Sequence, residues 1–175
     1  MSLTSPSPDN QSAPVDLMAR NADAPPLDPT LVAPPRLRLA VLTCMDTRIV
    51  PNQALGLAAG DAHVIRNGGA RATDDAVRSL VLSTRLLGVR QVAVIHHTEC
   101  GNAGTDEELQ DKLRETGMVD VPEVLHANGP TSLADDVARL RTPGLLADGT
   151  TVEGYTYDVR TGRLIPLEDE GGSRG

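Results

Sequence analysis

Short apolar runs alternate with segments of helical spacing along residues 37–167. Residues 37–43 and 91–96 are largely apolar and of strand length, which is typical of strands buried inside a sheet. Further strands are predicted over residues 62–66, 151–158 and 163–167. The chain therefore has the pattern of a sheet whose two most buried strands lie about fifty residues apart.

Helices are predicted between these strands, over residues 50–57, 74–87, 105–115 and 132–141. Around the helix over residues 74–87, the apolar surface extends through Leu82 and Leu86, which predicts burial on two sides. Thr73 is expected to cap this helix and Gly88 to end it. Alternating strands and helices predict an α/β fold, a mainly parallel sheet flanked by helices, with an antiparallel edge strand at the C-terminal end.

Residues 1–36 hold eight of the thirteen prolines, with polar residues between them. Such a segment cannot bury enough apolar surface to fold alone, so we predict a proline-rich N-terminal arm that lies on the domain or on a second subunit. A short helix is predicted within it, over residues 15–22. Residues 37–167 are expected to form one domain, and residues 168–175 a polar tail.

Composition narrows the set of partners. The formal charge of −8 repels phosphate backbones, and a chain without Phe or Trp offers few platforms for stacked bases, so nucleic acid is disfavoured. No apolar run is long enough to span a membrane, and residues 1–16 show no secretory signal. Two cysteines do not make a disulfide framework. We therefore expect a cytoplasmic protein with reduced thiols.

Side chains that bind metals stand at the ends of the two buried strands. Cys44 ends the first, with Asp46 and Arg48 following at steps of two, whereas His97 and Cys100 follow the other. Zinc takes thiolate sulfur and imidazole nitrogen, and a catalytic site keeps its fourth position for water. The three-residue step from His97 to Cys100 lets one turn present both side chains. We therefore predict a Zn²⁺ site bound by Cys44, His97 and Cys100.

Asp46 and Arg48 have two interpretations. As a catalytic pair, the carboxylate held by the guanidinium accepts a hydrogen bond, and later the proton, of a zinc-bound water. Alternatively, Asp46 is the fourth metal ligand and closes the site. His63 and His126 are interpreted as ordinary polar histidines, and His96 as buried and hydrogen-bonded rather than a ligand.

Together these residues resemble the β-class carbonic anhydrases, over about residues 37–167. The motifs that carry the resemblance are Cys44-x-Asp46-x-Arg48, His97-x-x-Cys100, Arg66-Asn67 and residues 154–164. The resemblance implies Zn²⁺ on the two cysteines and His97, with Asp46 and Arg48 as the catalytic dyad. It also implies reversible hydration of carbon dioxide to bicarbonate and a proton by zinc-bound hydroxide, in a homodimer or higher homo-oligomer.

Two features depart from many members of that family. Pro35 stands where many carry Gln, nine residues before the first cysteine, and no Phe is present to line a substrate pocket. Two alternatives therefore stay open. One is a hydrolase of a carbon dioxide analogue, carbonyl sulfide or carbon disulfide, and the other is a non-catalytic zinc-binding protein whose site is closed by Asp46.

Overall fold

The computed structural model describes residues 14–120, 122 and 126–168. It divides the chain into two units, between Leu31 and Val32. The first unit contains α1 (Leu17–Ala22), in which the N-cap Asp16 accepts a hydrogen bond from the backbone N–H of Ala19 at 3.0 Å. The helix predicted over residues 15–22 is therefore present but begins later. Residues 1–13 of the predicted arm and residues 169–175 of the predicted tail lie outside the described residues.

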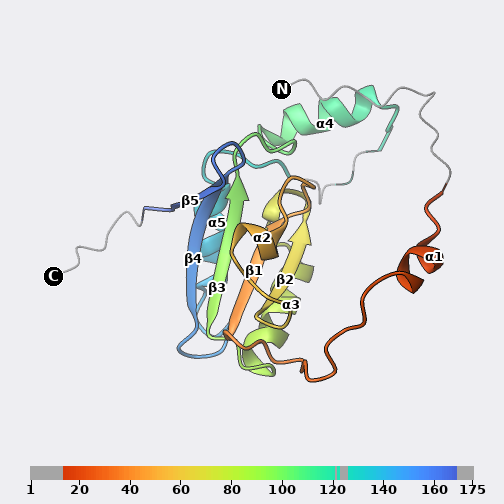
Figure 1. Ribbon diagram of the computed structural model, residues 1–175. Helices are drawn as coiled ribbons and strands as arrows, with labels where there is room; N and C mark the ends of the chain where they lie inside the picture. Colours follow the sequence, from red (N-terminus) through yellow and green to blue (C-terminus); the bar gives the residue numbers. More distant parts are fainter. Residues whose placement is uncertain (1–13, 121, 123–125, 169–175) are drawn as a thin grey trace. The chain divides into compact units, whose positions relative to one another are not determined.

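A five-stranded sheet is the central element of the second unit (Figure 1). The strand order is β2-β1-β3-β4-β5, and every neighbouring pair is parallel except β4 and β5. The strands are β1 (Leu39–Cys44), β2 (Ala62–Asn67), β3 (Gln91–His97), β4 (Thr151–Asp158) and β5 (Arg163–Pro166). The predicted α/β class, with its antiparallel edge strand at the C-terminal end, is confirmed.

Helices lie on both faces of this sheet, with α3 and α5 behind it and α2 in front of it in Figure 1. The helical elements of this unit are α2 (Pro51–Ala54), the 3₁₀ turn η1 (Gly68–Ala70), α3 (Asp74–Arg85), α4 (Asp106–Glu115) and α5 (Ser132–Leu140). The main core lies between α3, α5 and the sheet, where Leu80 and Val137 pack against Leu42 and Val94. The opposite face of the same strands buries a smaller apolar cluster.

Several predicted boundaries and one predicted burial differ from the structure. The helix predicted over residues 50–57 covers only Pro51–Ala54, and the one predicted over residues 74–87 ends at Arg85. β1 begins at Leu39 rather than residue 37, because Arg38 has a φ of +52° and cannot continue a strand. The Arg38 carbonyl accepts instead from the backbone N–H of Arg90, at 2.8 Å. On α3, Leu82 and Leu86 are 39% and 73% exposed, so a single chain buries only one side of that helix. Burial of the second side stays a prediction for an assembly.

Parallel pairing brings the carboxyl ends of the strands to one edge of the sheet. Cys44 is the last residue of β1 and pairs with Asn67, the last residue of β2. On the other side of β1, Thr43 pairs with Ile95, two residues before β3 ends at His97. The register therefore places the first cysteine and the histidine near one another. Within the part of the chain that the structure describes, no helix is long and apolar enough to cross a bilayer.

Candidate metal centre

Three of the predicted ligands converge at this edge of the sheet. The sulfurs of Cys44 and Cys100 and a ring nitrogen of His97 all lie within 4.8 Å of one another. Cys44 and His97 are buried, and Cys100 is partly exposed in the turn after β3. Two sulfurs bound to one tetrahedral zinc are about 3.8 Å apart, given Zn–S bonds of about 2.3 Å. The group is therefore compact enough to hold one ion with small movements.

His97 presents a nitrogen that lacks a partner. Its Nδ1 lies 2.9 Å from the backbone carbonyl of Thr98, which can only accept, so Nδ1 carries the proton and donates. Its Nε2 is buried and has no hydrogen-bond partner among the described residues. A buried polar atom without a partner is unfavourable, and a metal ion would take up its lone pair. Ligating histidines commonly donate their other N–H to a carbonyl, so this residue fits zinc.

The two sulfurs differ in charge when no metal is bound. The neighbouring Cys100 thiol is the main cause that lowers the pKa of Cys44, and the backbone N–H of Gly69 also donates to the Cys44 sulfur, at 3.4 Å. The Cys44 thiolate in turn raises the pKa of Cys100. One thiolate and one thiol therefore share the site. Because zinc binds thiolates, metal binding releases the second thiol proton.

Arg48 holds the Asp46 carboxylate in a two-pronged ion pair. Its Nε and Nη2 donate to the two carboxylate oxygens at 3.0 and 2.7 Å, and its backbone N–H donates at 2.9 Å. The side-chain hydrogen bond is the main cause that lowers the pKa of Asp46 from 3.8 to about 2. Asp46 Oδ2 lies 3.9 Å from His97 Nε2. An ionised carboxylate therefore stands directly beside the three candidate ligands.

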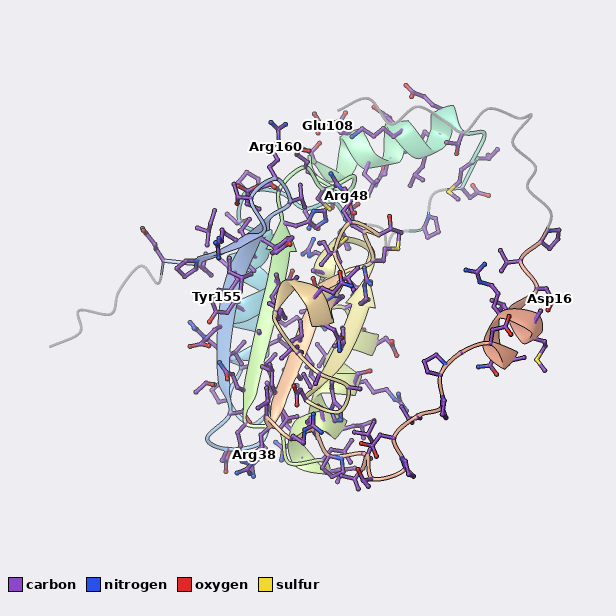
Figure 2. All side chains as sticks on the ribbon, viewed as in Figure 1. Asp16, Arg38, Arg48, Glu108, Tyr155 and Arg160 are labelled. Atoms are coloured by element: carbon purple, nitrogen blue, oxygen red, sulfur yellow. The ribbon has the colours of Figure 1, made fainter. Side chains whose placement is uncertain are left out.

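Arg48 is also attached to the turn that follows β3. Its Nη2 donates to the Glu99 backbone carbonyl at 3.0 Å, and its Nη1 lies 3.6 Å from the Glu99 carboxylate. That carboxylate also accepts from Arg160, and Figure 2 shows Arg48 and Arg160 above the same edge of the sheet. Glu99 itself has a φ of +55°, a strained conformation between His97 and Cys100. Arg48 therefore connects Asp46 to the turn that carries His97 and Cys100.

Residues 66–69 support the candidate metal centre through Arg66 and Gly69. Arg66 donates to the Cys44 carbonyl at 2.9 Å and to the Asp46 carbonyl at 2.8 Å, and so holds the chain between ligand and carboxylate. The resemblance included Arg66 without giving it this role. In the 3₁₀ turn η1, the Gly69 N–H approaches the Cys44 sulfur to 3.4 Å.

The remaining histidines are all hydrogen-bonded, as was predicted for His96. His96 is buried, and its Nε2 lies 3.2 Å from the Asp136 carboxylate on α5. Arg71 and the backbone N–H of Ala72 donate to the same carboxylate at 2.8 and 3.0 Å. Sequence reasoning missed Asp136, because an acidic residue in an amphipathic helix is usually exposed. The other two contact polar groups, His63 with Ser83 at 2.6 Å and His126 with Asp106 at 2.8 Å.

Apolar side chains surround the candidate ligands. Cys44 clusters with buried Ile49 and Ala70, and Tyr157 packs against the same cluster. The site therefore combines charged groups with an apolar wall. Such a wall suits a small uncharged ligand, and it strengthens the electrostatic interactions within the site.

Comparison with known proteins adds independent findings. A family model described as carbonic anhydrase matches residues 39–135. β-Carbonic anhydrase 1 of Mycobacterium tuberculosis is 36% identical over 155 residues, 85% of this chain and 94% of that protein. Carbon disulfide hydrolase of Acidithiobacillus thiooxidans is 34% identical over 156 residues, 76% of this chain and 78% of that protein. The crystal structure of a carbonic anhydrase from Streptococcus mutans, 35% identical, covers 86% of this chain and 92% of its own with a TM-score of 0.69.

Proposed function

Because the chain belongs to the β-carbonic anhydrase family, we propose that it is a Zn²⁺-dependent enzyme that interconverts carbon dioxide with bicarbonate and a proton. One observation carries the proposal: Cys44, His97 and Cys100 converge within 4.8 Å, beside the ionised carboxylate of Asp46. Zn²⁺ held by these three residues would supply a hydroxide nucleophile near neutral pH, by lowering the pKa of water.

Asp46, held in place by Arg48, would orient the attacking water and accept its proton. Oδ2 of Asp46 faces the ligand group, at 3.9 Å from His97 Nε2, so it can accept a hydrogen bond from water there. Its low pKa makes it a transient holder of the proton. The Asp46 side chain is 18% exposed, so that proton can pass on to solvent. Arg48 keeps the carboxylate ionised and correctly turned.

The same ion pair favours an open site over one closed by Asp46. Both carboxylate oxygens accept hydrogen bonds from Arg48. To become a fourth ligand, Asp46 would have to move toward the metal, which would disturb its two-pronged pairing with Arg48. Arg48 is in turn held by Glu99, which opposes such a movement. We therefore assign Asp46 to proton handling and not to metal binding.

A second substrate, carbon disulfide, is favoured by the 34% identity to a carbon disulfide hydrolase. Carbon disulfide is, like carbon dioxide, a small linear uncharged molecule that the apolar wall of Ile49, Ala70 and Tyr157 would accept. The same nucleophile would attack its carbon. The chemistry of the site alone therefore does not separate the two substrates, and an assay must do so.

Stopped-flow measurement of carbon dioxide hydration on the zinc-loaded chain tests the proposal. We expect carbon dioxide hydration well above the buffer rate, and hydrogen sulfide release from carbon disulfide is measured on the same protein. Hydrogen sulfide release without hydration would favour the second substrate. Neither activity in a fully metal-loaded chain would favour the closed, non-catalytic site.

We also propose a homodimer as the smallest stable assembly. Leu82 and Leu86 on α3 are 39% and 73% exposed, and they form an apolar surface that a partner subunit would cover. Sedimentation velocity at micromolar concentration should find a dimer, and Leu86→Glu should weaken it. A folded, active wild-type monomer under these conditions would contradict the proposal. A cytoplasmic location stays a prediction.

A further inference from the structure

Asn128 is bonded to both backbone segments that flank the cysteine ligands. Its side-chain amide lies 2.6 Å from the Gly69 carbonyl, which can only accept, so Nδ2 donates there. Its Oδ1 accepts from the side chain of Asn102 at 3.2 Å. Gly69 is in the turn above Cys44, and Asn102 is two residues after Cys100. One side chain thus connects the surroundings of both sulfurs.

The backbone of Asn128 strengthens this connection. Its N–H donates to the Asn102 carbonyl at 2.7 Å, and its carbonyl accepts from Gly104 at 3.2 Å. The second amide hydrogen points to His96 Nδ1, at 3.4 Å. A tautomer of His96 with its proton on Nε2 satisfies this contact and the one to Asp136 together. Hydrogen bonds therefore fix both the side-chain amide and the backbone of Asn128.

Gly69 is also the residue whose backbone N–H approaches a candidate ligand sulfur. This N–H lies 3.4 Å from the Cys44 sulfur. An N–H that donates to a thiolate holds the sulfur in position for the metal and withdraws part of its charge. The position of this donor therefore influences both the metal affinity and the metal–sulfur bond.

Close packing leaves the Gly69 peptide little freedom to move away. Gly69 has a φ of +84°, and a Cβ on it would lie 2.4 Å from Asn128 Oδ1 and 2.7 Å from Asn102 Nδ2. The side-chain amides of Asn102 and Asn128 are therefore packed directly against Gly69. A smaller side chain at position 128 would release the peptide and its N–H.

We propose that Asn128 is a positioning residue for the metal centre, which fixes the backbone N–H donor of Gly69 on the Cys44 sulfur. This inference rests on the proposed function, since it needs a metal on Cys44 and Cys100. Asn128 is not one of the candidate ligands, and its effect is transmitted through the Gly69 peptide group. Removing it should therefore alter the metal–sulfur bonds, in addition to any loss of local order.

The experiment compares the wild type with Asn128→Ala, Asn128→Asp and the control His126→Ala. His126 lies two residues away, on the same loop, and its side chain contacts Asp106. The substitution keeps its backbone carbonyl, which accepts from the Asn102 side chain at 3.0 Å. Zn²⁺ affinity is measured by competition with a chromophoric chelator, and the sulfur-to-metal charge-transfer band is measured in the Co²⁺-loaded proteins. Asn128→Ala should weaken Zn²⁺ binding by about 10- to 100-fold and shift the band to lower energy. The control should keep the wild-type affinity and band.

Asn128→Asp separates positioning from packing. It nearly preserves the shape and can still accept from Asn102, but it cannot donate to the Gly69 carbonyl. We expect the band to shift in this variant too, so it decides the matter should Asn128→Ala not fold. Weaker binding with an unshifted band, or wild-type values in both variants, would overturn the inference while leaving the proposed function intact. A wild type that binds neither metal would overturn both.

Discussion

Two adjacent histidines at the end of β3 have opposite surroundings. Both ring nitrogens of His96 have partners, with Nε2 3.2 Å from Asp136 and Nδ1 3.4 Å from Asn128. His97 uses only Nδ1, on the Thr98 carbonyl, and its buried Nε2 has no partner within the described residues. Successive side chains of a strand point to opposite faces, so one histidine reaches α5 and the other reaches the candidate ligands. An unsatisfied buried lone pair, and not burial itself, distinguishes the candidate ligand His97 from His96.

The two carboxylates on these faces differ in the same way. Asp136 is buried and accepts from three donors, on Arg71, Ala72 and His96. Burial alone would raise the pKa of Asp136, but these hydrogen bonds and the charge of Arg71 outweigh it and lower the pKa. Asp46 is bonded by Arg48, and its side chain is 18% exposed. The first carboxylate is therefore suited to stabilise the fold, and the second to exchange a proton.

The largest effect is expected from exchanging the two histidines for alanine one at a time. His97→Ala removes a metal ligand, so elemental analysis should find most of the zinc and all of the activity lost. His96→Ala removes a neighbour of the same size and burial, and it should keep most of the zinc. Equal zinc contents in the two variants would contradict the distinct roles assigned to the two faces of β3.

A smaller effect is expected from Arg48→Ala. Without the guanidinium, the Asp46 carboxylate is no longer held beside the water, so carbon dioxide hydration should fall by a factor on the order of 10². The three ligands are untouched, and the zinc content should stay at the wild-type level. Arg160→Ala, which removes only the exposed contact to Glu99, is the matched control and should change the rate far less. A wild-type rate in Arg48→Ala would exclude the dyad.

The smallest effect is expected on the other face, from Asp136→Asn, and it concerns stability. Loss of charged hydrogen bonds should lower the free energy of unfolding of the metal-free chain by about 2 kcal/mol at pH 7. Folding lowers the pKa of Asp136, so its contribution is fully present above 3.8 and is lost as the pH falls below that value. Urea unfolding should therefore show a weaker acid dependence in the variant. The same acid dependence in both proteins would contradict this role.

The sequence predicted the convergence of Cys44, His97 and Cys100 but not the residues that support them, for a physical reason. Cys44, His97 and Cys100 directly end or follow strands, and strand periodicity with parallel pairing places such residues at one edge. Asn128 and Asp136 reach the same edge from a loop and from α5. Their positions depend on how distant segments pack, and no local pattern encodes that.

The sequence also did not indicate the left-handed backbone conformation of two residues. Arg38 and Glu99 have positive φ angles of +52° and +55°, although neither is a residue type that favours them. The first shortens β1, and the second shapes the turn that carries the ligands. Tertiary hydrogen bonds hold both conformations, so the pattern of apolar residues gave no sign of them.

Zinc content and carbon dioxide hydration rate, measured together on Asp46→Asn, test the central claim most directly. The claim is that Asp46 handles the proton beside a metal bound by Cys44, His97 and Cys100. It predicts a variant that keeps about the wild-type amount of zinc and loses hydration activity by a factor on the order of 10² or more. A variant that loses its zinc, from a wild type without hydration activity, would contradict the claim and identify Asp46 as the closing ligand of a structural site.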